Sequence, residues 1–193
     1  MLEYDFDIFV ANAAVNEGGA LGEVPMANFR ELFEVNVFQT LETAQIAARQ
    51  FVKKGQGKII FLSSMAGIMS TPYVGPYTAT KHAIEAIAKT LRKEMAEFGV
   101  QVATINPGAF ATGFNDRSAE AKWKWFDEKI HFTRPEDMKE MEKGLEDQFD
   151  PQDMIDKMVE IIPQDSHKFR TAYPEETEQQ MKDEEAKHWE LEI

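Results

Sequence analysis

Short runs of mostly apolar residues recur along the chain, at 6–11, 58–62 and 100–105. Their length and their β-branched and aromatic content predict strands rather than helices. The run at 58–62 is almost continuously apolar, which is typical of a parallel strand covered on both faces. A shorter run at 169–173 predicts one further strand.

Segments with apolar residues at helical spacing separate these strands. The pattern predicts a helix over about 26–54, ended by Gly55 and Gly57, and a second over about 77–98, ended by Gly99. The acidic segment from 175 onward predicts a final helix. Because strands and helices alternate, we expect an α/β fold with a parallel sheet, in a single domain over 1–193. Residues 111–163 lack strand patterns, and we expect an excursion outside the sheet.

Composition and charge exclude several kinds of protein. The net charge of −13 argues against nucleic acid and anionic membrane surfaces as partners, because both are bound through clustered Lys and Arg. The absence of cysteine excludes disulfides, thiolate catalysis and cysteine-ligated metals. The four histidines show no metal-ligand spacing, so we expect no metal site. No apolar run approaches the roughly 18 residues of a membrane span, and the chain opens without an export signal, so we expect a cytoplasmic protein.

Three polar residues fall on the apolar faces of the two long predicted helices. Asn36 lies on the stripe of the first helix, and Tyr77 and Lys81 lie at the start of the stripe of the second. Burying an amide without partners costs on the order of 1–3 kcal/mol, so Asn36 must be hydrogen-bonded, either to local backbone or within a functional site. Lys is rarely buried, and at i and i+4 the Lys81 ammonium can lie near the Tyr77 phenol and favour its ionised form.

Further residues of interest follow the predicted strands. Asn12, Ser64 and Gly108 each come at a carboxyl end, where open parallel sheets place their ligand sites, so we expect them to converge on one crevice. A serine hydrolase is the obvious alternative. However, Ser64 is preceded by Ser63 and followed by Met65, and it is not set in a Gly-x-Ser-x-Gly elbow.

The arrangement of these residues resembles the short-chain dehydrogenase/reductase family, over nearly the whole chain. Ser64, twelve intervening residues, Tyr77, three more and Lys81 match the family's Ser and Tyr-x-x-x-Lys pattern. Residues 34–37 resemble the segment that bears its catalytic asparagine, and residues 107–112 resemble its Pro-Gly segment with a threonine four residues on. The resemblance implies a Rossmann-like three-layer sandwich. It also implies an NAD(P)-dependent oxidoreductase that interconverts an alcohol and a carbonyl of a small molecule.

The resemblance implies a role for each matching position. Tyr77 would be the general acid or base, with its pKa lowered by Lys81 and by the oxidised nicotinamide, and Ser64 would polarise the substrate oxygen. Asn36 would position a water that relays protons to Lys81. The expected catalytic residues are Asn36, Ser64, Tyr77 and Lys81, and the residues expected to contact NAD or NADP are Asn12, Tyr77, Lys81, Pro107, Gly108, Phe110 and Thr112.

Two features depart from the family pattern. Where the family has Asn-Asn-Ala-Gly, residues 11–14 end in Ala14, whose methyl group would lie beside the expected ribose. The family's first strands and Gly-rich turn, which bind the pyrophosphate at a helix N-terminus, do not precede Tyr4. We therefore expect an N-terminally truncated chain whose first strand has an unpaired edge. The alternatives are a non-catalytic module acting in association or regulation, and a hydrolase or lyase that uses Ser64 and Tyr77.

The resemblance further implies a homodimer or homotetramer in which the two long helices pack between chains. Five alanines would support this contact: Ala44, Ala47, Ala48, Ala83 and Ala86. The excursion at 111–163 would be the substrate loop. Its aromatic residues would either line a pocket for a fairly apolar alcohol or carbonyl, or pack the loop itself.

Overall fold

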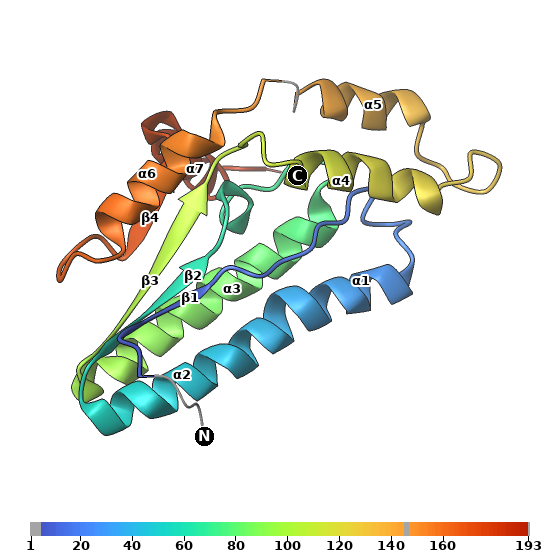
Figure 1. The fold of residues 1–193 in the computed structure, drawn as a ribbon. Helices are drawn as coiled ribbons and strands as arrows, with labels where there is room; N and C mark the ends of the chain where they lie inside the picture. The colour runs from blue at the N-terminus through green and yellow to red at the C-terminus, as the bar shows by residue number, and fades with distance from the viewer. Residues whose placement is uncertain (1–4, 145–146, 193) are drawn as a thin grey trace.

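The computed structural model describes residues 5–144 and 147–192 and contains a parallel sheet of four strands. The strands are β1 (Ile8–Ala11), β2 (Gly57–Leu62), β3 (Val100–Pro107) and β4 (Arg170–Tyr173), and they lie in that order across the sheet. Because neighbours along the chain are also parallel neighbours in the sheet, each connection crosses over one face and carries helices (Figure 1). The predicted α/β fold is confirmed, including the strand expected at 169–173.

The helices follow the predicted segments closely. They are α1 (Met26–Phe33), α2 (Thr40–Lys54), α3 (Gly75–Met95), α4 (Phe114–Ala121), α5 (Pro135–Lys143), α6 (Pro151–Ile161) and α7 (Glu175–Lys187), with short 3-10 turns η2 (Met65–Gly67), η3 (Ala96–Phe98) and η4 (Lys122–Lys124). A π-helical segment, η1 (Glu34–Gln39), joins α1 to α2, so the helix predicted over 26–54 is continuous but locally wider. Gly55 and Gly99 end their helices at a φ of 70°, a left-handed conformation that favours glycine. Within the described ranges, no helix is long and apolar enough to cross a membrane.

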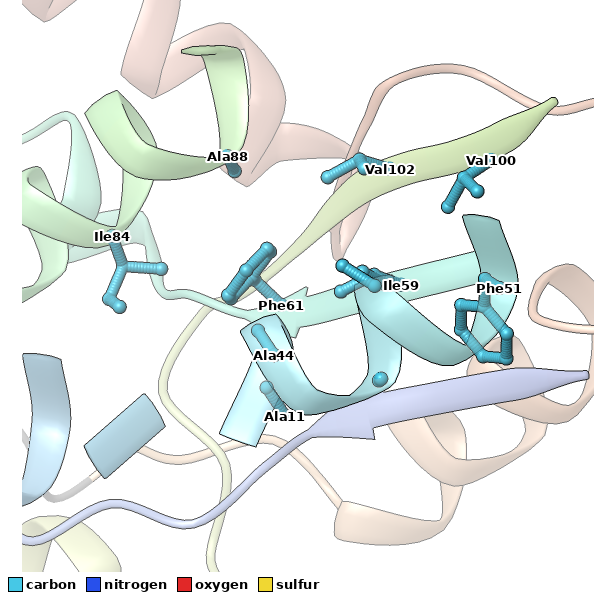
Figure 2. Close-up of a cluster of buried hydrophobic side chains, with 11 residues drawn as sticks. Ala11, Ala44, Phe51, Ile59, Phe61, Ile84, Ala88, Val100 and Val102 are labelled. Atoms are coloured by element: carbon cyan, nitrogen blue, oxygen red, sulfur yellow. The ribbon is translucent and has the colours of Figure 1, made fainter. Parts of the chain in front are cut away.

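The side chains of successive residues in β2 point to opposite faces of the sheet. Ile59 and Phe61 are fully buried on the face covered by α2 and α3, and Figure 2 shows Ile59 toward Phe51 of α2 and Phe61 toward Ile84 of α3. Ile60 lies between them in the sequence and is fully buried in a second cluster, on the other face. Both faces of the strand are therefore dry, which explains its continuous apolar run.

Helix α6 covers the second face of the sheet. Met154 of α6 belongs to the same buried cluster as Ile60 and Ile105, and Met158 packs against that cluster. With α2 and α3 on the opposite face, the fold is a three-layer sandwich (Figure 1). This position of α6 differs from the expectation that all of 111–163 lies outside the sheet, because the sheet needs an apolar helix over its second face. The helices α4 and α5 do lie beyond the carboxyl ends of β2 and β3 (Figure 1).

The alanines expected in a contact between chains divide between the core and the surface. Ala44, Ala47 and Ala48 are buried in the cluster between α2 and the sheet. They are already covered within one chain, so the expectation that they support a contact between chains is wrong. On α3, Ala83 is partly buried and Ala86 is exposed.

The packing of β2 generates a prediction about stability. Ile59→Val removes one carbon from a fully buried site, so we expect the free energy of unfolding to fall by roughly 0.5–1.5 kcal/mol. The measurement is urea denaturation followed by circular dichroism. The same change at Ile155, which is 50% exposed on α6, should cost less than about 0.5 kcal/mol. Equal losses at the two positions would contradict the packing described for β2.

Candidate functional site

The segment after β2 brings Ser64 to the carboxyl edge of the sheet. The Ser64 backbone is extended, and its hydroxyl accepts a hydrogen bond from the Ala66 N–H at 3.1 Å, which caps the short turn η2. The Ser64 carbonyl accepts a hydrogen bond from Asn106 Nδ2 in β3 at 2.8 Å. Ser64 is therefore held both by its own turn and by the neighbouring strand.

Helix α3 carries Tyr77 and Lys81 into the protein, where they are 8% and 4% exposed. The Lys81 ammonium donates to the Leu62 carbonyl at the end of β2 at 2.8 Å, and its Nζ lies 5.5 Å from the centre of the Tyr77 ring. The Ser64 side chain lies near enough to the Tyr77 phenol to favour its ionised form. The structure thus brings together Ser64, Tyr77 and Lys81, three of the four residues predicted to be catalytic.

Burial governs the protonation of Tyr77 and Lys81. It raises the pKa of the Tyr77 phenol above its ordinary value, and the nearby Ser64 side chain only partly opposes this. In the chain by itself, desolvation of the phenolate outweighs Lys81, so the lowered Tyr77 pKa that we expected with the oxidised nicotinamide present stays a prediction. Burial also lowers the pKa of Lys81 to about 8, against the attraction of the Glu85 carboxylate. At neutral pH the phenol is therefore protonated and the lysine is mostly charged.

The fourth predicted catalytic residue, Asn36, is 1% exposed and lies in the π-helical segment η1. Its Oδ1 accepts a hydrogen bond from the Val15 N–H, and its Nδ2 donates to the Val15 carbonyl, both at 2.8 Å. Nδ2 also donates to Thr80 Oγ1 of α3 at 3.2 Å. The amide is thus satisfied by backbone 21 residues away rather than by local backbone. Both of its N–H groups are used, which leaves one lone pair of Oδ1 for the expected water.

Pro107 and Gly108 lie against β4. Pro107 pairs with Tyr173 in the sheet, and the Gly108 N–H donates to the Tyr173 carbonyl at 2.8 Å. A Cβ at position 108 would lie 3.0 Å from Thr177 Oγ1, which is tighter than an ordinary contact. Glycine therefore lets this loop pass close to α7, which is a structural reason for its presence besides the expected cofactor contact.

The other positions expected to contact a dinucleotide differ in their exposure. Phe110 is buried, and its ring is stacked at 6.3 Å from that of Tyr173. Thr112 is exposed, and its hydroxyl accepts a hydrogen bond from the Phe114 N–H at 3.4 Å. Asn12 is exposed directly after β1. The Phe110 side chain therefore serves packing, whereas the polar groups of Thr112 and Asn12 are accessible.

Aromatic residues of the excursion at 111–163 serve two purposes. The Phe114 ring of α4 meets the Tyr77 ring edge to face, with ring centres 5.6 Å apart, and so covers one side of the phenol. Trp125 packs over Gly19, where a Cβ would lie 2.5 Å from the indole, and it donates to Glu17 at 3.3 Å. Trp125 thus packs the excursion against the loop after β1, and it also meets the His131 ring within the excursion, whereas Phe114 contacts the candidate site.

A cavity of about 840 Å³ lies beside the first turn of α3. Its wall includes the apolar side chains of Leu21, Pro72 and Phe132, and Thr78 of α3 also lines it. Thr78 Oγ1 is buried without a hydrogen-bond partner among the described residues. Because successive helical residues point about 100° apart, the cavity adjoins the turn that carries Tyr77 without being lined by Tyr77 itself.

Three residues that sequence reasoning missed form a cluster of polar side chains behind Ser64: Glu85 and Asn106, which are buried, and Arg170, which is partly exposed. Asn106 Nδ2 donates to Glu85 at 2.6 Å, and Arg170 Nη2 donates to the other oxygen of Glu85 at 2.5 Å. A signal for two of them was present in the sequence. Glu85 follows Lys81 by one helical turn, and Asn106 ends an apolar strand, where a polar side chain needs a partner.

Comparison with known proteins identifies relatives of the chain. Residues 4–123 match the family described as short chain dehydrogenase. An uncharacterized oxidoreductase of Bacillus subtilis is 32% identical over 161 residues, which cover 80% of this chain and 56% of that protein. Among solved structures, a short-chain dehydrogenase from Streptomyces avermitilis matches with a TM-score of 0.71 and 25% identity, covering 95% of this chain and 64% of the other. A gluconate 5-dehydrogenase from Burkholderia cenocepacia, solved in complex with NADP and tartrate, matches with a TM-score of 0.56 and 31% identity over 61% of this chain and 48% of the other. The chain spans about half the length of the curated relatives it matches.

The lowered pKa of Lys81 generates a prediction about stability and pH. Between about pH 8 and the ordinary lysine value of 10.5, the unfolded chain holds a proton that the folded chain has released, so burial of Lys81 costs less as the pH rises. We therefore expect the stability of the wild type, relative to Lys81→Met, to increase through this window. Above pH 10 the raised pKa of Tyr77 acts in the opposite direction, but equally in both proteins. Urea denaturation across this pH range is the measurement, and parallel profiles for the two proteins would contradict the assignment.

Proposed function

The chain belongs to the short-chain dehydrogenase family, and from this premise we propose that it interconverts an alcohol and a carbonyl of a small molecule by hydride transfer, with NAD or NADP as the cofactor. The observation that carries the proposal is that Ser64 lies with the buried Tyr77 and Lys81 at the carboxyl edge of the sheet. Open parallel sheets bind their ligands at this edge. A general acid beside a polarising hydroxyl is the equipment that carbonyl reduction requires.

Tyr77 is the general acid or base of the proposed reaction. In the reducing direction its phenol gives a proton to the substrate oxygen, and in the oxidising direction the phenolate takes that proton back. Burial keeps the phenol protonated, which suits the reducing direction. The Ser64 hydroxyl, which lies near the phenol, donates to the same substrate oxygen and polarises the carbonyl. The Lys81 charge stabilises the phenolate when it forms, and Asn36 holds the water through which the proton is replaced.

The donor groups at this edge suit the nicotinamide half of a dinucleotide. Lys81 uses one N–H on the Leu62 carbonyl, which leaves two for ribose hydroxyls. Asn12 and Thr112 are exposed and offer an amide and a hydroxyl, and the backbone at 107–110 borders the same edge. When bound, NAD or NADP supplies or accepts the hydride, and the protein's part is to orient it.

The cavity beside α3 suits the part of the substrate that does not react. Leu21, Pro72 and Phe132 offer apolar contacts, and the guanidinium of Arg134 offers a polar one. Ligand sites commonly combine a mostly apolar wall with a few polar groups that fix orientation. The proposed substrate is therefore a partly apolar alcohol or carbonyl.

Binding of NADH and NADPH to the purified chain tests the proposal. We expect binding to enhance the nicotinamide fluorescence, and Lys81→Ala to weaken it by at least about tenfold, because the ribose loses a charged donor. Lys89→Ala is the matched control, since it removes an exposed lysine from the same helix and should bind as the wild type does. No binding at millimolar concentration would contradict the proposal. It would favour the alternative, a non-catalytic module acting in association or regulation.

Tyr77→Phe separates cofactor binding from chemistry. The variant loses only the hydroxyl, so we expect NADH or NADPH to bind within about twofold of the wild type, while turnover of carbonyl substrates falls by roughly 10²–10⁴-fold. The measurement is the change in absorbance of the reduced nicotinamide with a panel of carbonyls and alcohols. Undiminished turnover by this variant would remove Tyr77 from the mechanism.

A further inference from the structure

We propose that the buried carboxylate of Glu85 is a positioning residue of the candidate site, which orients the Ser64 segment through Asn106 and keeps Lys81 an ammonium cation. The role of Glu85 in catalysis rests on the proposed function. Its effects on the charge of Lys81 and on the position of the Ser64 segment are properties of the folded chain and can be tested without turnover.

Glu85 is almost completely buried, with 2% of its surface exposed. A carboxylate removed from water is strongly destabilising unless it is paired and hydrogen-bonded. Arg170 of β4 supplies the positive partner at 2.5 Å, and Asn106 supplies an amide donor at 2.6 Å. A Cβ at Gly67 would lie 2.9 Å from the Glu85 side chain, so the turn after Ser64 is shaped to admit this carboxylate. These contacts describe an ionised carboxylate with a partner on each oxygen.

Asn106 connects Glu85 to Ser64. Asn106 Nδ2 has two hydrogens, of which one goes to Glu85 and the other to the Ser64 carbonyl at 2.8 Å. An ionised carboxylate can only accept hydrogen bonds, so it requires the nitrogen of the Asn106 amide, and not the oxygen, to face it. The charge on Glu85 therefore selects the amide orientation that holds the Ser64 backbone in place.

Glu85 also interacts electrostatically with Lys81. The two residues are one turn apart on α3 and are both almost completely buried, so little water screens their charges. Among the described residues, Lys81 contacts the Leu62 carbonyl of β2 and the Tyr77 ring of α3. It also interacts electrostatically with Glu85, which is itself paired with Arg170 of β4. The Glu85 charge raises the pKa of Lys81, and burial opposes it. With a resulting pKa of about 8, Lys81 is mostly charged at neutral pH, and the Glu85 carboxylate increases the charged fraction.

Titration of Lys81 by NMR tests this inference directly. With ¹³C-labelled lysine, Lys81→Met identifies the Lys81 signal, and the midpoint of its titration is then compared between variants. We expect Glu85→Gln to lower the midpoint by about one pH unit, because it removes a nearby negative charge while keeping the side-chain size. Glu94→Gln removes an exposed carboxylate from the same helix and should leave the midpoint unchanged. An unchanged midpoint in folded Glu85→Gln would overturn the proposal.

A second variant decides the matter if Glu85→Gln does not fold. Arg170→Gln removes the partially exposed cation that neutralises Glu85 and so leaves a stronger negative field at Lys81. We expect the Lys81 midpoint to rise, and a midpoint that is unchanged or falls would overturn the inference. Neither titration needs cofactor or substrate, so failure of the proposed function would leave these results intact. If the chain is active, the basic midpoint of its pH–rate profile should shift in the same direction as the Lys81 midpoint in each variant.

Discussion

Burial of the Lys81 ammonium at the edge of the sheet is the constraint on which the candidate site depends. A charge removed from water must be compensated, and three groups do so here: the Leu62 carbonyl, the face of the Tyr77 ring and the Glu85 carboxylate. One of them comes from the end of β2 and two from α3. By joining these elements, the lysine fixes how the first turns of the helix lie over the end of the strand. That position in turn sets the contact between Tyr77 and Ser64.

Two buried amides extend this arrangement to the neighbouring loops. Asn36 joins Val15, in the loop after β1, to Thr80 of α3, and Asn106 joins the Ser64 segment to Glu85. Each amide uses both of its N–H groups, so each loop is held from inside the protein rather than from the surface. The candidate catalytic groups are therefore on a wall of regular structure. The cover over Tyr77 comes instead from the excursion, through Phe114 of α4.

Much of the fold could be predicted because its signals are local. A strand covered on both faces must be apolar at consecutive positions, and this is why 58–62 was recognisable before its neighbours were known. Helix α6 shows the limit of such reasoning. Its apolar residues, such as Met154 and Met158, are interrupted by charged ones, and nothing in that pattern says which surface they cover. The helix becomes part of the sandwich only because the second face of the sheet is apolar and has to be covered.

The same division applies to the candidate site. The sequence by itself determined that Tyr77 and Lys81 lie one turn apart on a helix, and that Ser64 and Gly108 follow the carboxyl ends of strands, because helical spacing and strand ends are local properties. Only the tertiary structure decided that Asn36 bonds to Val15, that Glu85, Asn106 and Arg170 stand behind the site, and that the Tyr77 pKa is raised in the chain by itself. Hydrogen-bond partners far apart in the chain and the loss of water around a phenol depend on how elements pack, and packing is not encoded in the spacing of any one segment.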